Sequence, residues 1–363
     1  MSTPDEERRS DSARPPAHSA QELLALLNLP GIGPAKALRA ALITANFDAL
    51  LQSAANDWDR ALEAASDELE TCRRNDVTVL SLFDERYPAR LRALHDPPPV
   101  LFCHGSLDAL DATRSVAVVG TREPTSFGSS ATDAITEALA SAGWSVISGL
   151  AKGVDTAAHA AALKYRTPTV AVMAGGLDRV YPAENRDLAK AIVEHGGALV
   201  SEQRWGIAPQ RSSFVQRNRI QTGLAAAVVV AQTGRVSGTM HTARHAAAQG
   251  RPVFCPVPHT DHEKNEGLLL LLSSPARDLC DALPAWKQAG ALCKRLGSEP
   301  LAHPIKKDRF DEFLQALDLA LEHDSVTRPE KRWWPDFDPP SQLGASDAVA
   351  SDDGQAPLFA VAD

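Results

Sequence analysis

The stretch from Ser115 to His159 constrains the fold more than any other part of the chain, because it passes twice through a strand, a glycine turn and a helix. The first pass is a short apolar, β-branched run that ends at Gly120, just before an amphipathic segment. The second pass repeats this plan around Gly149 and Gly153. Two neighbouring strand-to-helix turns place backbone N–H groups and positive helix ends at one edge of a parallel sheet, where anionic ligands bind.

The same alternation of strands and helices continues through the middle of the chain. The predicted strands are residues 115–119, 145–148, 169–173, 198–201, 227–231 and 253–256, and the predicted helices between them are residues 129–142, 156–164, 184–194, 214–223 and 239–249. Such alternation predicts an α/β fold with a Rossmann-like, doubly wound, mostly parallel sheet. The G-x-G-x-x-G motif is missing after Gly120, so no nicotinamide or flavin cofactor is predicted.

Composition shifts divide the chain into five predicted regions. These are a disordered lead (1–19), a small helical module (20–87), the Rossmann-like domain (88–283), a helical region (284–323) and an acidic disordered tail (324–363). Residues 77–83 are predicted as a strand, residues 96–102 as a proline-stiffened connection before a short edge strand, and residues 264–283 and 305–323 as further helices.

The helical module has the pattern of a helix-hairpin-helix, SAM-like unit. A hairpin with Gly31 and Gly33 separates two helices, and the second helix carries Lys36 and Arg39. The glycine hairpin of such a unit can offer N–H groups to a DNA phosphate. Many units of this shape serve only in packing, so both interpretations stay open.

Cysteine usage and hydropathy indicate a cytoplasmic protein. The five cysteines are scattered and form no C-x-x-C pair, which predicts reduced thiols and neither a disulfide framework nor a thiolate zinc site. No run of about 18 apolar residues occurs, and the N-terminus is charged, so neither a membrane span nor a secretory signal is predicted.

The net charge of -9 would count against nucleic acid as a partner, but the distribution of the charges matters more than their sum. Residues 203–260 contain seven arginines but no Asp, Glu or Lys. An acidic chain with such a stretch can still present a positive pocket to nucleic acid. The alternative is buried sheet and helix with a few solvated arginines, and charge alone does not choose between the two.

An ordered set of short motifs resembles the DNA-processing protein A (DprA/Smf) family. The motifs are Gly120-Thr121-Arg122, residues 148–155 with Ala158-His159, Gly175-Gly176-Leu177-Asp178 with Tyr181-Pro182 and Asn185, residues 197–202, Arg217-Asn218-Arg219-Ile220, and Ser237-Gly238-Thr239 with Thr242-Ala243. They run in family order from about Pro88 to about Leu272, and the ordered set is far more specific than any one of them.

The resemblance implies a non-enzymatic protein that binds single-stranded DNA, loads a RecA-type recombinase and forms a homodimer. The pathway that it serves, whether natural transformation, repair or phage defence, stays open. Predicted DNA- or phosphate-binding residues are Gly120, Arg122, Ser148, Gly149, Lys152, Gly153, Gly175, Gly176, Arg217, Asn218, Arg219, Ser237, Gly238 and Thr239. Tyr181 and Phe214 are the candidate base-stacking rings. The structural alternatives are that Arg217 and Arg219 pair with Glu184 or Asp178 and that Phe214 belongs to the core.

Two other chemistries compete with DNA binding. The Ser237-Gly238-Thr239 turn is similar to that of LOG-type phosphoribohydrolases, so a nucleotide-binding or nucleotide-hydrolysing sensor is the alternative function. No carboxylate follows this turn, and cleavage of a glycosidic bond needs one, so binding is favoured. His241 and His245, with His259 and His262, have a spacing that can hold zinc, but no H-E-x-x-H glutamate accompanies them and no metal is predicted.

Three features depart from the family pattern or lie outside it. No winged-helix pattern follows the main domain, and residues 256–267 differ from the usual rim of the pocket. The tail ends in Gln355, Leu358 and Phe359, spaced as in the short peptide that docks on the bacterial sliding clamp. The alternative is an ordinary hydrophobic terminus.

Overall fold

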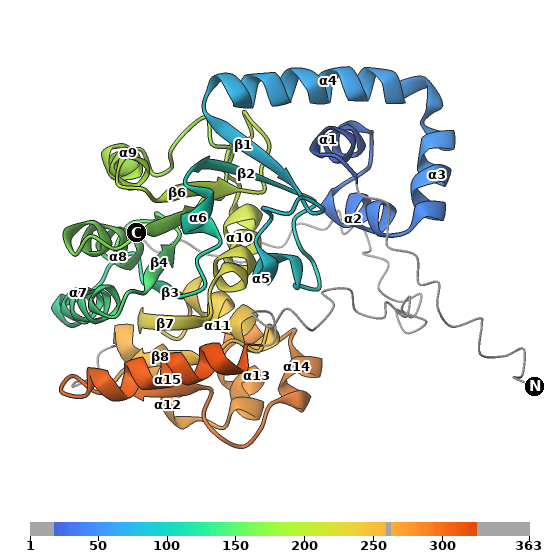
Figure 1. Cartoon of the computed structure of the whole chain (residues 1–363). Helices are drawn as coiled ribbons and strands as arrows, with labels where there is room; N and C mark the ends of the chain where they lie inside the picture. Colours follow the sequence, from blue (N-terminus) through green and yellow to red (C-terminus); the bar gives the residue numbers. More distant parts are fainter. Residues whose placement is uncertain (1–17, 259–262, 325–363) are drawn as a thin grey trace, which may run out of the picture.

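A helical module and a nine-stranded sheet make up the computed structural model, which describes residues 18–258 and 263–324 (Figure 1). The helices of the module are α1 (Ala20–Asn28), α2 (Pro34–Leu42), α3 (Thr44–Ser53) and α4 (Ala55–Arg74). Ser19 and Glu22 form a capping box that starts α1, because each side chain accepts the other's backbone N–H. Lys36 of α2 reaches back to the preceding turn, where its Nζ donates to the Gly31 carbonyl at 2.9 Å.

The sheet has the order β1-β2-β6-β5-β4-β3-β7-β8-β9. Its strands are β1 (Val77–Ser81), β2 (Val100–Gly105), β3 (Ser115–Gly120), β4 (Ser145–Ser148), β5 (Thr169–Val172), β6 (Ala198–Ser201), β7 (Ala227–Gln232), β8 (Val253–Pro256) and β9 (Ala302–Ile305). From β6 to β9 all neighbours are parallel, and β1 and β2 add an antiparallel end. The predicted Rossmann-like, mostly parallel sheet is confirmed. The prediction of a connection through residue 102 followed by an edge strand is wrong, because β2 already begins at Val100 and pairs with both β1 and β6.

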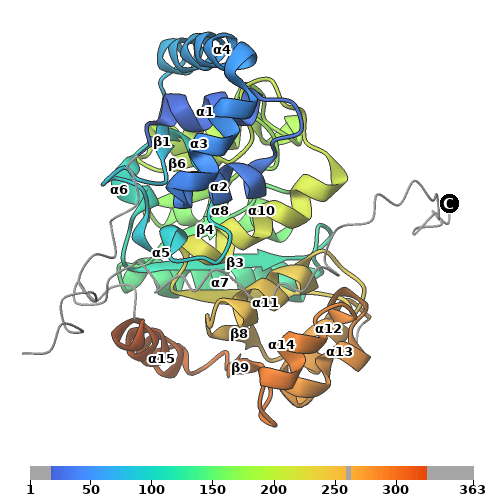
Figure 2. The ribbon, with the colours of Figure 1, turned by 90° about the vertical axis from the view of Figure 1, so that its right-hand side faces the viewer.

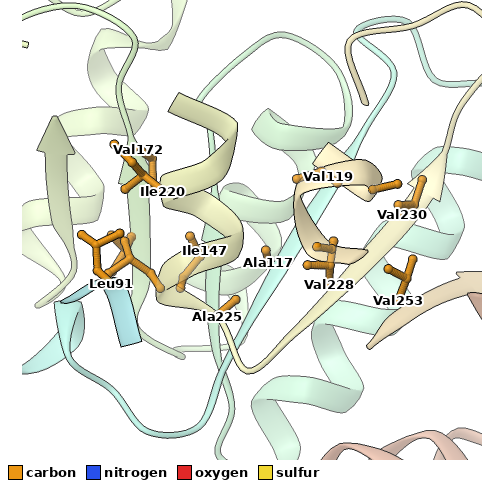
Figure 3. Packing of buried hydrophobic residues seen from close by; sticks show 14 of the residues in the cluster. Leu91, Ala117, Val119, Ile147, Val172, Ile220, Ala225, Val228, Val230 and Val253 are labelled. Carbon is orange, nitrogen blue, oxygen red and sulfur yellow. The ribbon is translucent and has the colours of Figure 1, made fainter. Parts of the chain in front are cut away.

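Helices cover both faces of this sheet. They are α5 (Ala89–Arg92), α6 (Leu107–Leu110), α7 (Ser126–Ser141), α8 (Val154–Lys164), α9 (Arg186–Glu194), α10 (Arg211–Leu224), α11 (Thr239–Ala248), α12 (Glu266–Ser273), α13 (Leu279–Ala282), α14 (Gly290–Arg295) and α15 (Phe310–His323), with 3-10 turns at 183–185, 263–265, 276–278 and 284–286. Val228 and Val230 of β7 belong to the same buried cluster as Ile220 of α10 (Figure 3), whereas Val229 belongs to the cluster with residues of α7 and α15 on the opposite face. Consecutive strand residues thus fill two separate cores, as the pleat requires.

The sheet extends into the predicted helical region 284–323, where Ala302–Ile305 form the strand β9. The module lies at the β1 end of the sheet, and α12 to α15 lie at the β9 end (Figures 1 and 2). The single helix predicted for residues 264–283 is wrong, because the chain breaks at Ser274 and Pro275. The helix predicted from Ile305 begins only at Phe310, since Ile305 belongs to the edge strand β9. Among the described residues, no helix is long and apolar enough to cross a membrane.

Two of the five cysteines are not reduced thiols. Cys280 and Cys293 form a disulfide with their Cα atoms 6.4 Å apart, which corrects the prediction of unpaired cysteines. The two lie on α13 and α14, on either side of buried Trp286, and the fold of this short region brings them together. Cys72, Cys103 and Cys255 are free and buried.

Candidate functional site

The loops that follow β3, β4 and β5 meet at the carboxyl edge of the sheet. The β3 and β4 loops contact each other closely: Val154 N donates to the Thr121 carbonyl at 3.1 Å, and Gly153 has a φ of +79°. A Cβ at Gly153 would lie 2.5 Å from the Arg122 carbonyl carbon, so only glycine fits this left-handed position. This close contact between the two loops fixes the position of the Arg122 backbone.

Two aromatic rings and two cations gather at this edge. The Arg122 guanidinium lies 5.4 Å from the centroid of the Phe214 ring, and the Tyr181 ring lies 5.6 Å from the same centroid. Tyr181 is 53% exposed, so its ring is free to contact a ligand. Lys152 reaches the same place and pairs with Glu184 at 2.8 Å, with both side chains exposed. Exposed ion pairs of this kind contribute little to stability, so a ligand anion can displace Glu184 at a small cost in free energy.

Two adjoining cavities share Arg122 and Phe214 as a common wall. The smaller, about 80 Å³, is also lined by Lys152, Gly175, Tyr181 and Pro209. The larger, about 350 Å³, lies against the N-terminal end of α11 and one side of α10. Unpaired N–H groups at helix starts attract anions, so the larger cavity suits phosphate and the smaller one a flat apolar group.

A buried ion pair forms the floor of the larger cavity. Arg217 donates to the Val172 carbonyl at 2.8 Å and lies 3.8 Å from the Asp155 carboxylate. Burial raises the pKa of Asp155, and the Arg217 charge opposes that rise. A Cβ at Gly149 would overlap the Arg217 guanidinium, so Gly149 is needed for the arginine to pass.

The family model for DNA recombination-mediator protein A matches residues 78–289. The chain belongs to this family. It is 38% identical over 186 residues to DNA processing protein DprA of Bacillus subtilis, covering 51% of this chain and 62% of that protein. Matches to two further curated relatives span 53% and 45% of their lengths, so the chain corresponds to roughly half of each.

Two solved structures of the family share the fold. Streptococcus pneumoniae DprA superposes with a TM-score of 0.58 and 30% identity, covering 69% of this chain and 91% of that one. A Helicobacter pylori DNA processing protein A structure, described by its single-stranded DNA binding mode, gives a TM-score of 0.52 and 27% identity over 67% of this chain and 96% of that one.

Some residues of the family motifs line the two cavities, and others are buried away from them. Gly120, Asn218, Ser237, Gly238 and Thr239 line the larger cavity. Ser148 does not face either cavity, because its hydroxyl is buried and donates to the Val118 carbonyl at 2.7 Å. Gly176 is likewise covered, since its N–H donates to the Ile207 carbonyl at 2.8 Å.

Arg219 does not join the predicted group of cations. Its guanidinium pairs with Glu202 at 2.7 Å and with Asp96 at 3.0 Å, and it lines neither cavity. Residues two apart on a helix point in nearly opposite directions, so Arg217 and Arg219 of α10 cannot serve one site. The partners expected from the structural alternative, Glu184 and Asp178, are also wrong for both arginines.

The loop after β3 is held by a residue that sequence reasoning missed. The Gln232 side chain accepts from Thr125 N at 2.8 Å and donates to Thr125 Oγ1 at 2.9 Å and to Asn265 Oδ1 at 2.8 Å. The signal in the sequence is a glutamine that ends the apolar run of β7. The Gln232 carbonyl also accepts from Thr121 N at 2.8 Å, so this one residue holds both ends of the loop that carries Arg122.

The histidines have structural surroundings where the structure describes them. No group of three or more His, Cys, Asp or Glu side chains suited to a metal forms within residues 18–258 and 263–324. His241 and His245 lie on α11, and burial lowers the pKa of His245 to about 4. His259 and His262 of the zinc alternative lie outside the described residues.

His159 predicts a pH dependence of stability. Its Nδ1 lies 2.8 Å from Thr169 Oγ1, and burial lowers its pKa from 6.5 to about 3. The unfolded chain therefore binds more protons below pH 6.5, so the free energy of unfolding falls as the pH drops from 6.5 towards 3. The slope of the unfolding free energy against pH reflects the extra protons bound by the unfolded chain. We expect His159→Gln to remove up to one such proton, which reduces the slope by up to about 1.4 kcal/mol per pH unit.

Urea unfolding of both proteins at pH 7, 6 and 5 measures this slope. His195→Gln is the matched control, because His195 is exposed at the end of α9. Equal slopes for wild type and His159→Gln would show that the imidazole is not held neutral in the folded state.

Proposed function

We propose that the chain binds single-stranded DNA at the carboxyl edge of the sheet. The observation that carries the proposal is the cluster of Arg122, Phe214 and Tyr181 beside Lys152. Non-specific binding of a single strand combines cations along the phosphates with rings on which bases stack, and this edge offers both. A relative from Helicobacter pylori, described by its single-stranded DNA binding mode, shares the fold and supports the proposal.

The two cavities take different parts of the strand. The larger one, at the N-terminus of α11, accepts a phosphate near Arg122, Thr239 and the glycine loops. The smaller one, between Tyr181, Phe214 and Pro209, accepts a base. A duplex keeps its bases stacked inside and cannot use the smaller cavity, which is the physical basis of a preference for single strands.

A titration at two salt concentrations tests the proposal. Wild-type protein is mixed with single-stranded and double-stranded oligonucleotides of equal length. We expect tighter binding of the single strand and an affinity that falls steeply with salt, because each phosphate contact releases about 0.7 counterion from a single strand. Equal binding of both forms, or none, would overturn the proposal.

Wider roles follow from family membership. We infer that the chain acts as a binding protein rather than an enzyme, hands its strand to a RecA-type recombinase, forms a homodimer and works in the cytoplasm. The family's description as a recombination mediator supports the hand-off. The candidate sliding-clamp peptide, Gln355 to Phe359, lies outside the described residues. A recombinase filament assay with and without the protein tests the hand-off.

A nucleotide-binding or nucleotide-hydrolysing role is the second candidate. It is favoured by Asp155, the carboxylate that lines the larger cavity and whose pKa is raised by burial. The side chain is only 8% exposed and is paired with Arg217, which favours a structural role. Release of base from nucleoside monophosphates by the wild type, lost in Asp155→Asn, would support the enzyme instead.

A further inference from the structure

One carboxylate of the helical module is bound inside the main domain. Glu68 lies on α4 with its side chain 8% exposed. Its Oε2 accepts from Arg204 Nε at 2.8 Å and from Arg204 Nη2 at 2.5 Å, and its Oε1 accepts from Trp205 N at 3.1 Å. A carboxylate that is buried and accepts three N–H bonds is held in place far better than one in an exposed ion pair. Glu68 also lies before residue 78, where the match to the family begins.

The loop that Glu68 holds, residues 202–210, is clamped from two sides. On the module side, Trp205 packs into the apolar cluster that contains Val77 and Phe102. On the other side, Gly206 N donates to Asp178 Oδ1 at 2.9 Å.

The same loop then runs to the smaller cavity. A Cβ at Gly175 would lie 2.8 Å from Pro209 Cδ, so the loop packs directly on the β5 turn. Pro209 lines the smaller cavity, and Gln210 caps α10, whose first turn presents Phe214. A displacement of Arg204 and Trp205 is therefore passed along the loop to the wall of the cavity and to its stacking ring.

We propose that Glu68 is a positioning residue for the base-binding cavity, acting through Arg204 and the 202–210 loop. The inference rests on the proposed function, since it assigns the smaller cavity to a base. In this view the helical module contributes to DNA binding without touching DNA: it sets the wall against which a base packs. Arg122 and Lys152, the proposed phosphate contacts, lie on the loops after β3 and β4. The hydrogen bonds of Glu68 go to Arg204 and Trp205 instead, so Glu68 does not position these two cations.

This separation gives the proposal a distinctive readout. Loss of the Glu68 anchor weakens base packing but leaves the phosphate contacts in place. The affinity for oligothymidylate falls while the salt slope is unchanged, because the slope counts phosphates neutralised. An abasic strand of the same length has no base to pack, so its affinity stays at the wild-type value. General damage to the fold would lower both affinities together.

The test compares Glu68→Gln with Glu70→Gln. Gln keeps the shape of Glu68 and an oxygen for Trp205 N but loses the charge paired with Arg204. Glu70 lies two residues further along α4 and pairs with Arg73 and Arg74 at the surface, so it is a matched control. For Glu68→Gln we expect three- to tenfold weaker binding of oligothymidylate, no change for the abasic strand, and faster hydrogen exchange in residues 203–210.

The outcomes separate this inference from the proposed function. If the wild type binds oligothymidylate and Glu68→Gln binds it equally well, the inference is wrong and DNA binding stands. Equal losses for both strands also overturn it. If the wild type binds no single strand, the proposed function fails first. Arg204→Gln, which leaves the bond from Trp205 N to Glu68, replaces Glu68→Gln if that variant does not fold, and the same pattern is expected.

Discussion

Replacing Arg122 with alanine is expected to weaken binding of single-stranded DNA by about tenfold, or about 1.4 kcal/mol. The guanidinium lies on the wall shared by both cavities and 5.4 Å from the Phe214 ring centroid, so its loss removes a phosphate contact and a cation–π contact together. The dependence of the affinity on salt concentration should also weaken, by the amount that corresponds to about one phosphate contact. Titration of wild type and variant at two salt concentrations measures both effects.

A surface arginine remote from this edge provides the control. Arg295 is exposed at the end of α14 and lines neither cavity, so Arg295→Ala changes the net charge equally without touching the site. We expect Arg295→Ala to bind like wild type. If both variants lose affinity to the same extent, the effect of Arg122 is one of overall charge and the proposed site is incorrect. Salt-independent binding would contradict the phosphate contact itself.

Replacing Arg217 with methionine is expected to lower the free energy of unfolding by about 3 kcal/mol. Methionine fills much of the volume but leaves the Asp155 carboxylate buried without its ion-pair partner, and removing one partner of such a pair costs about 3–5 kcal/mol. The Val172 carbonyl also loses its 2.8 Å hydrogen bond. The pair is 3.8 Å apart, so we expect the lower end of that range. Urea unfolding at pH 7 measures the loss.

The double variant Arg217→Met with Asp155→Asn tests the cause. Asparagine is neutral, so it removes the uncompensated charge and should restore part of the stability. If the double variant is no more stable than Arg217→Met, the loss comes from packing and the carbonyl bond rather than from the charge.

The sequence by itself determined the sheet and the edge that carries the candidate site. The strands predicted at 145–148, 198–201 and 253–256 coincide with β4, β6 and β8. These positions are local properties: a buried parallel strand needs an apolar run, and a close strand-to-helix turn needs glycine. Because parallel strands end at one edge, the same local pattern is enough to place Arg122 and Lys152 together.

Only the tertiary structure decided which side chains are free and which are already bound. Arg219 is paired with Glu202 and Asp96, and Arg204 with Glu68, which lies 136 positions earlier in the chain. The disulfide and the extra strand β9 likewise depend on how distant segments pack. Charge and periodicity in the sequence predict the secondary structure around a residue and the kinds of interaction that its side chain can make. Its partner is chosen by contacts between segments far apart in the sequence, which no local pattern encodes.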